Sequence, residues 1–564
     1  MTVSRRVCAS ISTLTLAMVL AGCATPVAQG PIDINLVALN DFHGNLEASK
    51  YTYTDGNGQK HTVQAGGIDT LAAALQAWRK QDKDLLLVSA GDLVGASPAL
   101  SALWADEPAI EALNMLGLRV SAVGNHEFDQ GRKELLRQQH GGCESPRPAK
   151  ACQFAPDFGG AKFTYLAANM VDSATGKPVL PGFTIEEVKG VKVGLVGVVL
   201  RDIGSVVMGS AIAGLSFGDE AEAINNAIPA MRAQGAKVFV ALVHEGGKTV
   251  ESPLQAGCNQ LGGDIVEIVR KLDPAVRLVI SGHSHQGYLC KVDGRVVTQA
   301  DAAGHLLSRI TMKVEPASGK VLDIDARNVV MKPGEYPLDP KVSAFLASVK
   351  ERSRAALAKP VARLGASIVA RRSNEAGEAP LGNLIADAVL AATAQYGSQI
   401  GFMNTGGIRK DLEAGEGTVT TFGHTQAVLP FSNTLVVMDL TGAQIRALLE
   451  YQWARPGASS PNILQVSNGF TYEWDEQQPK GQRVVAGSIK LHGKPLEDDK
   501  SYRVVANNFI AEGGDSFPVF AKGSNRVETG IVDLDALNDY LRKNEGVGAP
   551  SASLAPSARI VKVR

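Results

Sequence analysis

The chain has 564 residues, more than one ordinary domain holds, so at least two domains are expected. Its content of 45% apolar and 20% charged residues is typical of a globular protein and gives no sign of disorder. The formal net charge of −1 does not favour a nucleic acid polymer as partner. A small anionic substrate would therefore have to be held by local cations and metal ions.

The first 23 residues are predicted to be a targeting segment. Arg5 and Arg6 form a basic start, and the apolar run at 11–21 is too short to span a bilayer as a stable anchor. The run ends in Leu-Ala-Gly-Cys23, which resembles a bacterial lipobox, in which Cys23 carries the lipid. A plain secretory signal cut nearby is the alternative. We therefore expect an exported protein, lipid-anchored to a bacterial membrane in the periplasm or at the cell surface, with no other membrane contact.

Four cysteines remain after the targeting segment: Cys143, Cys152, Cys258 and Cys290. An even number in an exported protein predicts two disulfides. Three pairings are possible, and proximity in the sequence favours Cys143–Cys152 and Cys258–Cys290. A zinc site built from these residues is the weaker interpretation, because the chain has no CxxC pair.

In chain order, buried strands alternate with helices up to about residue 330. Strands are predicted at 32–40, 85–90, 118–123, 192–199, 237–243 and 276–280, and helices at 68–80, 105–116 and 219–233. Pro229 should kink or split the last of these helices. The alternation predicts a layered α/β domain, bounded at 24–335.

The proline-rich stretch at 333–340 breaks this pattern. A charged helix predicted at 341–358 is interpreted as a connector between domains, bounded at 336–360; an ordinary surface helix is the alternative. A second domain is expected over 361–564, where predicted helices at 384–395, 441–451 and 533–543 alternate with short strands and Gly-rich turns.

Eight side chains of metal-binding type follow the predicted strands. They are Asp41 and His43, Asp92, Asn125 and His126, His244, and His283 and His285. A single histidine is more often a surface or core residue than a ligand, but five at strand ends are hard to explain as packing. We expect Asp41 and His43 to lie in extended backbone, so that side chains two residues apart face the same way, and likewise His283 and His285.

Nitrogen and oxygen ligands without thiolates suit zinc, manganese or iron. Seven ligands are too many for one tetrahedral ion, which predicts two divalent metal ions with Asp92 as the bridge. Two such ions lower the pKa of a shared water and hold the oxygens of a phosphate ester. His126 is left to protonate the leaving oxygen or stabilise the transition state, with Asp129 orienting its ring.

These motifs resemble those of calcineurin-like metallophosphatases. The motifs at 404–409, 429–434 and 508–515 further resemble the 5′-nucleotidase family, which includes UDP-sugar hydrolases. The resemblance implies an α/β chain: a four-layer metallophosphatase β-sandwich flanked by helices, a connector helix and a C-terminal α/β 5′-nucleotidase domain. It implies one metal held by Asp41, His43, Asp92 and His285, and a second held by Asp92, Asn125, His244 and His283. His126 and Asp129 match the catalytic dyad.

The C-terminal motifs also suit a nucleotide. Phe431 and Phe509 could sandwich a base, Asp515 could accept hydrogen bonds from ribose hydroxyls, and Arg409 offers a planar fork for phosphate. Core packing is the alternative for the two Phe residues and a solvated surface for the Arg. Further contacts are expected from Asn404, from Asn433 and from either Arg371 or Arg372. Relatives usually have Gly where this chain has Ser432, which leaves the preferred substrate open.

The sequence therefore predicts an enzyme in which a metal-activated water releases phosphate from nucleoside 5′-phosphates. The alternatives are a nucleotide pyrophosphatase acting on UDP-sugars or NAD, or a 2′,3′-cyclic phosphodiesterase. A lipoprotein that binds nucleotides or metals without turnover is disfavoured by the intact ligand set. The native metal, the preferred base, the membrane leaflet and the oligomeric state stay open.

Overall fold

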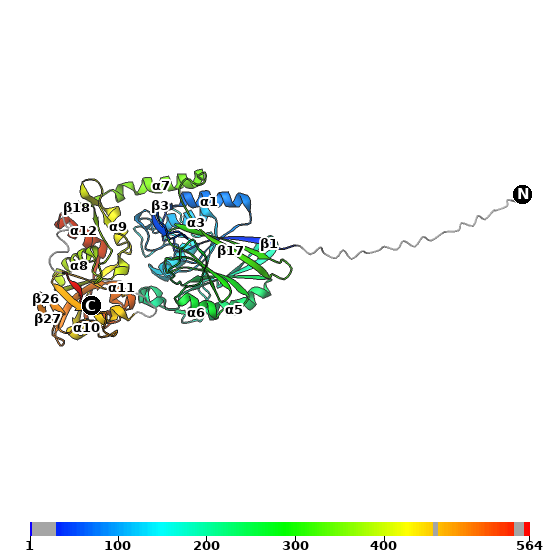
Figure 1. Ribbon diagram of the computed structural model, residues 1–564. Helices are drawn as coiled ribbons and strands as arrows, with labels where there is room; N and C mark the ends of the chain where they lie inside the picture. The colour runs from blue at the N-terminus through cyan, green and yellow to red at the C-terminus, as the bar shows by residue number, and fades with distance from the viewer. Residues whose placement is uncertain (3–29, 455–460, 546–557) are drawn as a thin grey trace.

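The computed structural model describes residues 1–2, 30–454, 461–545 and 558–564. The predicted lipidation site, Cys23, lies outside the described residues. Figure 1 shows an N-terminal region (30–332, blue to green) beside a C-terminal region (358–564, yellow to red). Among the helices of the described part of the chain, none has the length and apolar content needed to cross a membrane.

The N-terminal region is built on two sheets. The first has six strands in the order β17 (Val321–Val330), β16 (Leu306–Val314), β1 (Ile32–Leu39), β4 (Leu86–Ser89), β5 (Leu118–Ala122) and β6 (Thr164–Leu166). The second has seven, in the order β12 (Ala256–Cys258), β14 (Gly287–Val292), β15 (Arg295–Ala300), β13 (Val276–Ser281), β11 (Val238–His244), β9 (Val191–Val199) and β8 (Phe183–Val188). The central strands of both sheets run parallel.

The two sheets pack face to face through apolar side chains such as Leu36 and Val88 on one and Val240 and Leu278 on the other. Helices α1 (Ile68–Gln81) and α3 (Glu107–Leu116) cover the outer face of the first sheet. Helices α5 (Glu220–Ala233) and α6 (Asp264–Arg270) cover the outer face of the second. These four layers confirm the predicted sandwich flanked by helices. Each central strand is buried on both faces, which explains its continuous apolar sequence.

Helix α7 (Pro340–Leu357) packs on α1 and α2 (Ala99–Ala102) of the N-terminal region and on α9 (Phe422–Val428) of the C-terminal region. Its N-terminus is capped by the Asp339 carboxylate, which accepts bonds from the N–H groups of Lys341 and Val342. The helix therefore contacts both regions of the chain, as Figure 1 also shows.

The C-terminal region is built on a five-stranded sheet in the order β24 (Gln465–Val466), β20 (Ile400–Met403), β28 (Ser501–Asn507), β23 (Thr434–Thr441) and β29 (Ser524–Val532). Helices α8 (Pro380–Ala392) and α12 (Asp533–Lys543) pack on one face, and α10 (Gly442–Glu450) packs on the other. A smaller sheet follows the order β27 (Lys494–Pro495), β26 (Lys490–Leu491), β25 (Phe470–Trp474) and β30 (Ile560–Lys562).

The structure refines two element predictions. Pro229 is expected to kink or split its helix, and the helix does not split: α5 runs unbroken from Glu220 to Ala233. Proline removes one backbone hydrogen bond, and the burial of Ile224, Ile228 and Met231 against the second sheet offsets that loss. The helix predicted at 384–395 is α8, which begins earlier, at Pro380, because proline suits the first turn of a helix.

Candidate active site

All eight predicted metal-type side chains lie at one edge of the sandwich. Asp41 and His43 follow β1, Asp92 follows β4, Asn125 and His126 follow β5, His244 ends β11, and His283 and His285 follow β13. The site thus forms where the carboxyl ends of the parallel strands of both sheets meet. Gly124 allows the close approach there, because a Cβ at this position would lie 2.2 Å from Asp92 Oδ1.

The side chains form two groups whose donor atoms lie within 4.8 Å of one another. One group comprises Asp41, His43, Asp92 and His285, and the other comprises Asp92, His244 and His283. Asn125 joins the second group, since its Oδ1 lies 3.0 Å from His244 Nε2 and 2.9 Å from His283 Nδ1. Asp92 belongs to both groups.

The backbone at these ligands is not extended, so the predicted geometry is wrong. The φ angles are 48° at Asp41, 46° at His43, 52° at Asp92, 69° at His283 and 51° at His285, all in the left-handed region. Backbone bonds hold these turns: the N–H of Asp41 donates to Gly91 O and that of His43 to Asp92 O, each at 3.0 Å. The ligands converge because their loops turn sharply, at a conformational cost of about 1 kcal/mol or more per residue.

Backbone carbonyl groups orient two of the imidazole rings. His43 Nδ1 lies 2.9 Å from Gly95 O, and His244 Nδ1 lies 2.7 Å from Ala90 O. A carbonyl oxygen only accepts, so each Nδ1 carries a proton, and in the neutral ring Nε2 then presents a lone pair. His43 Nε2 and His244 Nε2 lie 3.7 Å and 3.3 Å from Asp92 Oδ2. Unprotonated nitrogens and carboxylate oxygens converging on shared points fit divalent cations.

Burial decides the pKa of two members of this cluster, whereas the charge of Asp92 raises the pKa of His244 to about 10 against its burial. Burial raises the pKa of Asp41 to about 7 and lowers the pKa of His43 to about 3. Both shifts disfavour the charged forms in a site closed to solvent. A bound cation would reverse the shift at Asp41, because positive charge stabilises the carboxylate.

His126 and Asp129 form a hydrogen-bonded pair, with His126 Nδ1 lying 2.9 Å from Asp129 Oδ1. The second oxygen of Asp129 accepts a bond from the Ala96 N–H at 3.1 Å. Burial lowers the pKa of His126, but the charges of Asp129 and Asp92 outweigh it, so that the pKa is raised overall. The His126 backbone N–H donates to Asp92 Oδ1 at 2.8 Å, which ties the pair to the candidate metal ligands.

Glu127 is a site residue that the sequence analysis did not single out. Its buried carboxylate accepts bonds from the N–H groups of Asp92 at 3.0 Å, Leu93 at 2.7 Å and Gly124 at 2.6 Å. It thereby joins the loops after β4 and β5. Its position next to His126 could have identified it from the sequence, because a Glu in an otherwise buried strand-end motif needs hydrogen-bond partners.

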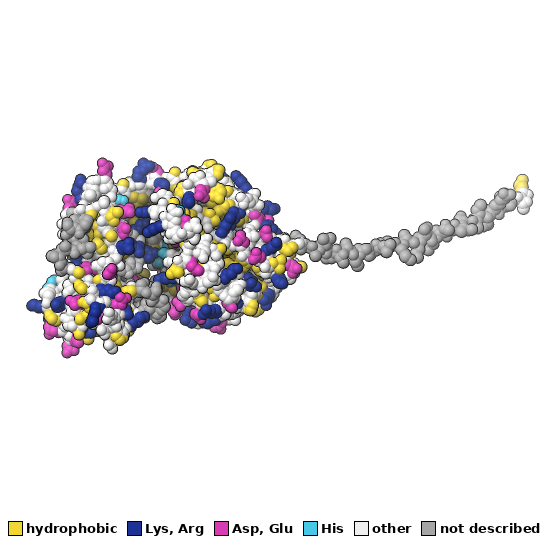
Figure 2. Space-filling model, viewed as in Figure 1, with side chains coloured by type: hydrophobic (Ala, Val, Ile, Leu, Met, Phe, Trp, Pro, Cys, Tyr) yellow, Lys and Arg dark blue, Asp and Glu magenta, His cyan; other side chains and the backbone are white. Residues whose placement is uncertain are grey.

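A cleft of about 1470 Å³ joins the two regions. Its lining includes Asp92, Asn125, His126, Asp129, His283 and His285 from the N-terminal region, and Asn404, Arg409, Phe431, Asn433, Phe509 and Asp515 from the C-terminal region. Figure 2 shows a histidine side chain (cyan) in the hollow between the two regions. Fold and cleft thus bring together residues that lie hundreds of positions apart in the sequence.

Phe431 contacts both sets of residues. Its ring stacks on that of His126, with centroids 5.7 Å apart, and the Arg409 guanidinium lies 5.8 Å from its centroid. Ser432 next to it has a φ of 57°, a conformation that a glycine would adopt with less strain. Neither Arg371 nor Arg372 lines the cleft, and the Arg371 guanidinium donates to Arg409 O at 2.5 Å.

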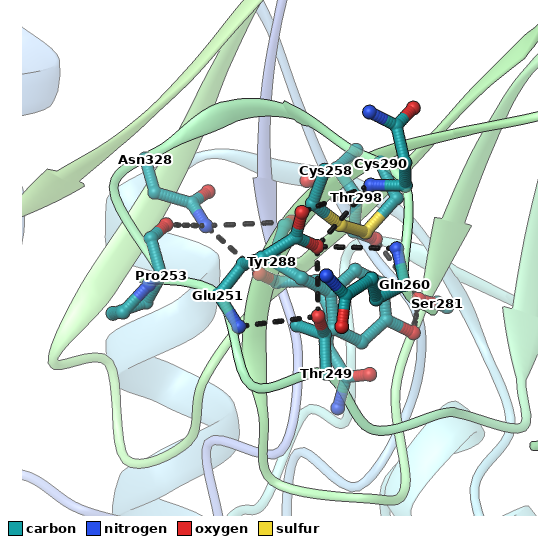
Figure 3. Close-up of a disulfide and its surroundings, with 12 residues drawn as sticks. Thr249, Glu251, Pro253, Cys258, Gln260, Ser281, Tyr288, Cys290, Thr298 and Asn328 are labelled. Carbon is teal, nitrogen blue, oxygen red and sulfur yellow. Dashed lines mark hydrogen bonds between the residues drawn. A yellow bond between two sulfur atoms is a disulfide. The ribbon is translucent and has the colours of Figure 1, made fainter. Parts of the chain in front are cut away.

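Both pairings of cysteines favoured by the sequence are present as disulfides, Cys143–Cys152 and Cys258–Cys290. Figure 3 shows Cys258–Cys290 beside Tyr288 and the loop that carries Glu251. Glu251 accepts bonds from Thr249 Oγ1 at 2.9 Å and from the Gln260 N–H at 3.2 Å. The disulfide therefore fastens to β14 a loop whose start, at Gly246 to Lys248, lines the cleft.

A helix-covered double sheet with paired Asp and His groups at its strand ends defines a metallophosphoesterase, and comparison with known proteins agrees. Residues 34–287 match the calcineurin-like phosphoesterase family, and residues 357–522 match the C-terminal domain of 5′-nucleotidases. A 5′-nucleotidase precursor from Thermus thermophilus has a similar structure, with a TM-score of 0.72 and 27% identity over 94% of this chain and 99% of that one.

Two sequence relatives share this architecture. A cell wall protein of Listeria monocytogenes is 30% identical over 563 residues, covering 93% of this chain and 69% of its own length. An endonuclease of Bacillus subtilis is 30% identical over 519 residues, and this chain spans 40% of that longer protein. The chain belongs to the 5′-nucleotidase family of calcineurin-like metallophosphatases.

Proposed function

We propose that this metallophosphatase releases phosphate from nucleoside 5′-monophosphates. The observation that carries the proposal is the single cleft, in which the Asp and His groups face two aromatic rings and an Arg from the C-terminal region. The 5′-nucleotidase name of the Thermus thermophilus protein supports the same substrate class. The metal ligands belong to a domain at 24–335 and the nucleoside contacts to one at 361–564, with a connector at 336–360.

The donor set is suited to two divalent cations, zinc or manganese among them, with Asp92 shared. When bound, the cations would activate a water and neutralise charge on the phosphate. Arg409 adds a planar guanidinium for the phosphate oxygens. Asp129 holds the proton on His126 Nδ1, so that His126 Nε2 can deliver a proton to the leaving 5′-oxygen.

The nucleoside would lie against the C-terminal wall of the cleft. Phe431 and Phe509 offer ring faces for the base, and every base has an aromatic face to stack. Asp515 accepts bonds from the ribose hydroxyls, and Asn433 contacts the nucleoside. Arg371 and Arg372 lie outside the lining, so a phosphate contact from either would need a change in the loop at 371–380.

The protein acts outside the cytoplasm in this proposal, anchored by lipid on Cys23. The two disulfides support export, because such bonds persist in oxidising compartments. The Listeria monocytogenes relative is named a cell wall protein, which is compatible with an extracytoplasmic location.

A second candidate activity is cleavage of pyrophosphates or cyclic phosphodiesters. The cleft continues past the candidate metal ligands along Glu245 to Lys248 and Gly262 to Asp264, and reaches Lys271. Its 1470 Å³ exceeds the ~300–1,000 Å³ of ordinary ligand pockets. That space would accommodate a second group beyond the phosphorus, as in UDP-sugars or NAD.

Phosphate release from AMP by the purified chain tests the proposal. The protein is stripped of metal and assayed again with zinc, manganese or cobalt added back. Metal-dependent release is expected. A folded protein that binds two ions and releases no phosphate from AMP, but cleaves UDP-glucose, NAD or a 2′,3′-cyclic nucleotide to nucleoside monophosphates, would establish the second activity. A protein that binds no metal would refute the site assignment.

A further inference from the structure

Three polar side chains form a chain of hydrogen bonds behind the nucleoside wall. Asn507 ends β28 and Asn404 follows β20, and these two strands are parallel neighbours. Asn507 Nδ2 donates to Asn404 Oδ1 at 2.9 Å, and Asn404 Nδ2 donates to Asp515 Oδ2 at 2.6 Å. Asn507 and Asn404 are 2% and 1% exposed, so water cannot replace a hydrogen bond that their amides lose.

The helix cap made by Asn507 decides which groups donate and which accept in this series of hydrogen bonds. Asn507 Oδ1 accepts a bond from the Ile510 N–H at 3.0 Å and thereby caps α11 (Asn508–Ala511). The NH₂ of Asn507 is therefore the group that faces Asn404, which makes Asn404 accept through its oxygen. The NH₂ of Asn404 is in turn the group that faces Asp515. A reversed Asn404 amide would put its oxygen against a carboxylate, where neither atom can donate.

Asp515 needs such support because its backbone is strained. Its φ is 56° and that of Ser516 is 65°, both in the left-handed region. Besides the bond from Asn404, Asn462 Nδ2 donates to Asp515 O at 3.4 Å. The Asn404 bond is the shorter of these two and acts on the carboxylate itself, so it directs the oxygen that accepts it.

We propose that Asn507 is a positioning residue that acts through Asn404 to orient the Asp515 carboxylate for the hydroxyls of the substrate's ribose. It would set the preference for ribonucleosides over analogues that lack those hydroxyls. This inference rests on the proposed function, in which Asp515 accepts from the sugar. A charged hydrogen bond that is well aimed in the complex gains affinity only when the ligand has a hydroxyl to donate.

The test uses full-length Asn507→Ser and Asn507→Asp proteins. Ser keeps the α11 cap but is too short to reach Asn404, and Asp keeps shape and cap but has no N–H to donate. Inhibition of p-nitrophenyl phosphate hydrolysis is measured with adenosine and with 2′,3′-dideoxyadenosine. We expect both variants to weaken adenosine binding about three- to tenfold and to leave the dideoxy analogue and p-nitrophenyl phosphate turnover unchanged. Asn508→Ser, in the same helix but bonded to Met208, is the matched control and should change nothing.

A double variant separates positioning from general loosening. Asn507→Ser should have no further effect on adenosine binding in an Asp515→Ala background, because the residue through which it acts is gone. Equal weakening of both nucleosides, additive effects in the double variant, or a parent protein that binds both nucleosides equally would each overturn the proposal. Absence of AMP turnover in the parent protein would refute the proposed function instead, while the inhibition assay still tests the positioning role.

Discussion

The two walls of the cleft are built differently. Five of the seven candidate metal ligands are buried, with Asp41 and His244 0% exposed and Asp92 1% exposed, whereas His283 and His285 are half-buried; backbone bonds hold the turns at Asp41 and His43. Phe431, Phe509 and Asp515 on the opposite wall are only half-buried and lie in a loop and in short helical turns of the C-terminal region. Chemistry needs donor atoms held at fixed points, whereas stacking on a base tolerates small displacements. The comparison therefore separates a rigid reactive wall from a more adaptable recognition wall.

The largest loss is expected from removing the carboxylate common to both metal groups. Asp92→Asn keeps the shape of the side chain but removes the shared charge, so metal content and activity should fall together. Losing several kcal/mol of charge stabilisation would lower kcat about a thousandfold. Metal analysis and phosphate release from AMP check this. Full activity with only one bound ion would mean that the reactive wall is not built around Asp92.

His126→Ala should separate chemistry from metal binding. General acid catalysis contributes about a hundred- to ten-thousandfold, so kcat should fall by that factor while metal content stays unchanged. Glu127→Gln provides the contrast, because it disturbs the loops after β4 and β5 and should lower metal content as well. Unchanged kcat in His126→Ala would remove this residue from the reaction.

Phe509→Ala should affect only recognition. Loss of one stacking partner costs ~1–3 kcal/mol per base, or about five- to 150-fold in kcat/KM for AMP. Turnover of p-nitrophenyl phosphate, which has no nucleoside, should stay the same. If both substrates lost activity equally, Phe509 would be a packing residue of the C-terminal region instead of a contact to the base.

The smallest effect concerns stability on the recognition wall, where Asp533 supports Asn433. Its backbone N–H donates to Asn433 O at 2.8 Å, and burial raises the pKa of the Asp533 carboxyl to about 7. A raised carboxyl pKa stabilises the fold below the unfolded value of 3.8, and this contribution is lost as the pH rises through about 7. Asp533→Asn cannot ionise, so its Tm advantage over the parent should grow from pH 5 to pH 8.

The exposed Asp535→Asn in the same first turn is the control for loss of a carboxylate at this end of the helix, and its Tm difference from the parent should change less with pH than that of Asp533→Asn. Parallel Tm profiles of the parent and Asp533→Asn proteins would show that the Asp533 carboxyl does not titrate with the fold.

Much of this molecule could be predicted from local sequence. Apolar runs located six central strands, because a strand buried on both faces leaves a continuous apolar signature, and the Asp, Asn or His residues that follow five of these runs located the edge where the site forms. Local sequence did less well at Pro229, where the helix does not split because burial of the helix face outweighs a local breaker. It also gave extended backbone at Asp41 and His43, where bonds to the loop after β4 impose left-handed turns.

By itself, the sequence determined the layered α/β architecture and the identity of the metal-type side chains, since both depend on patterns within short stretches of chain, and it favoured the cysteine pairing that the structure has. Only the tertiary structure decided how the ligands divide into two groups, which loops Glu127 joins, and that Phe431 lies on His126. The direction of the bonds from Asn507 through Asn404 to Asp515 also emerged only there. These features depend on contacts between residues more than thirty positions apart, and the packing of the sheets, not local preference, sets such distances.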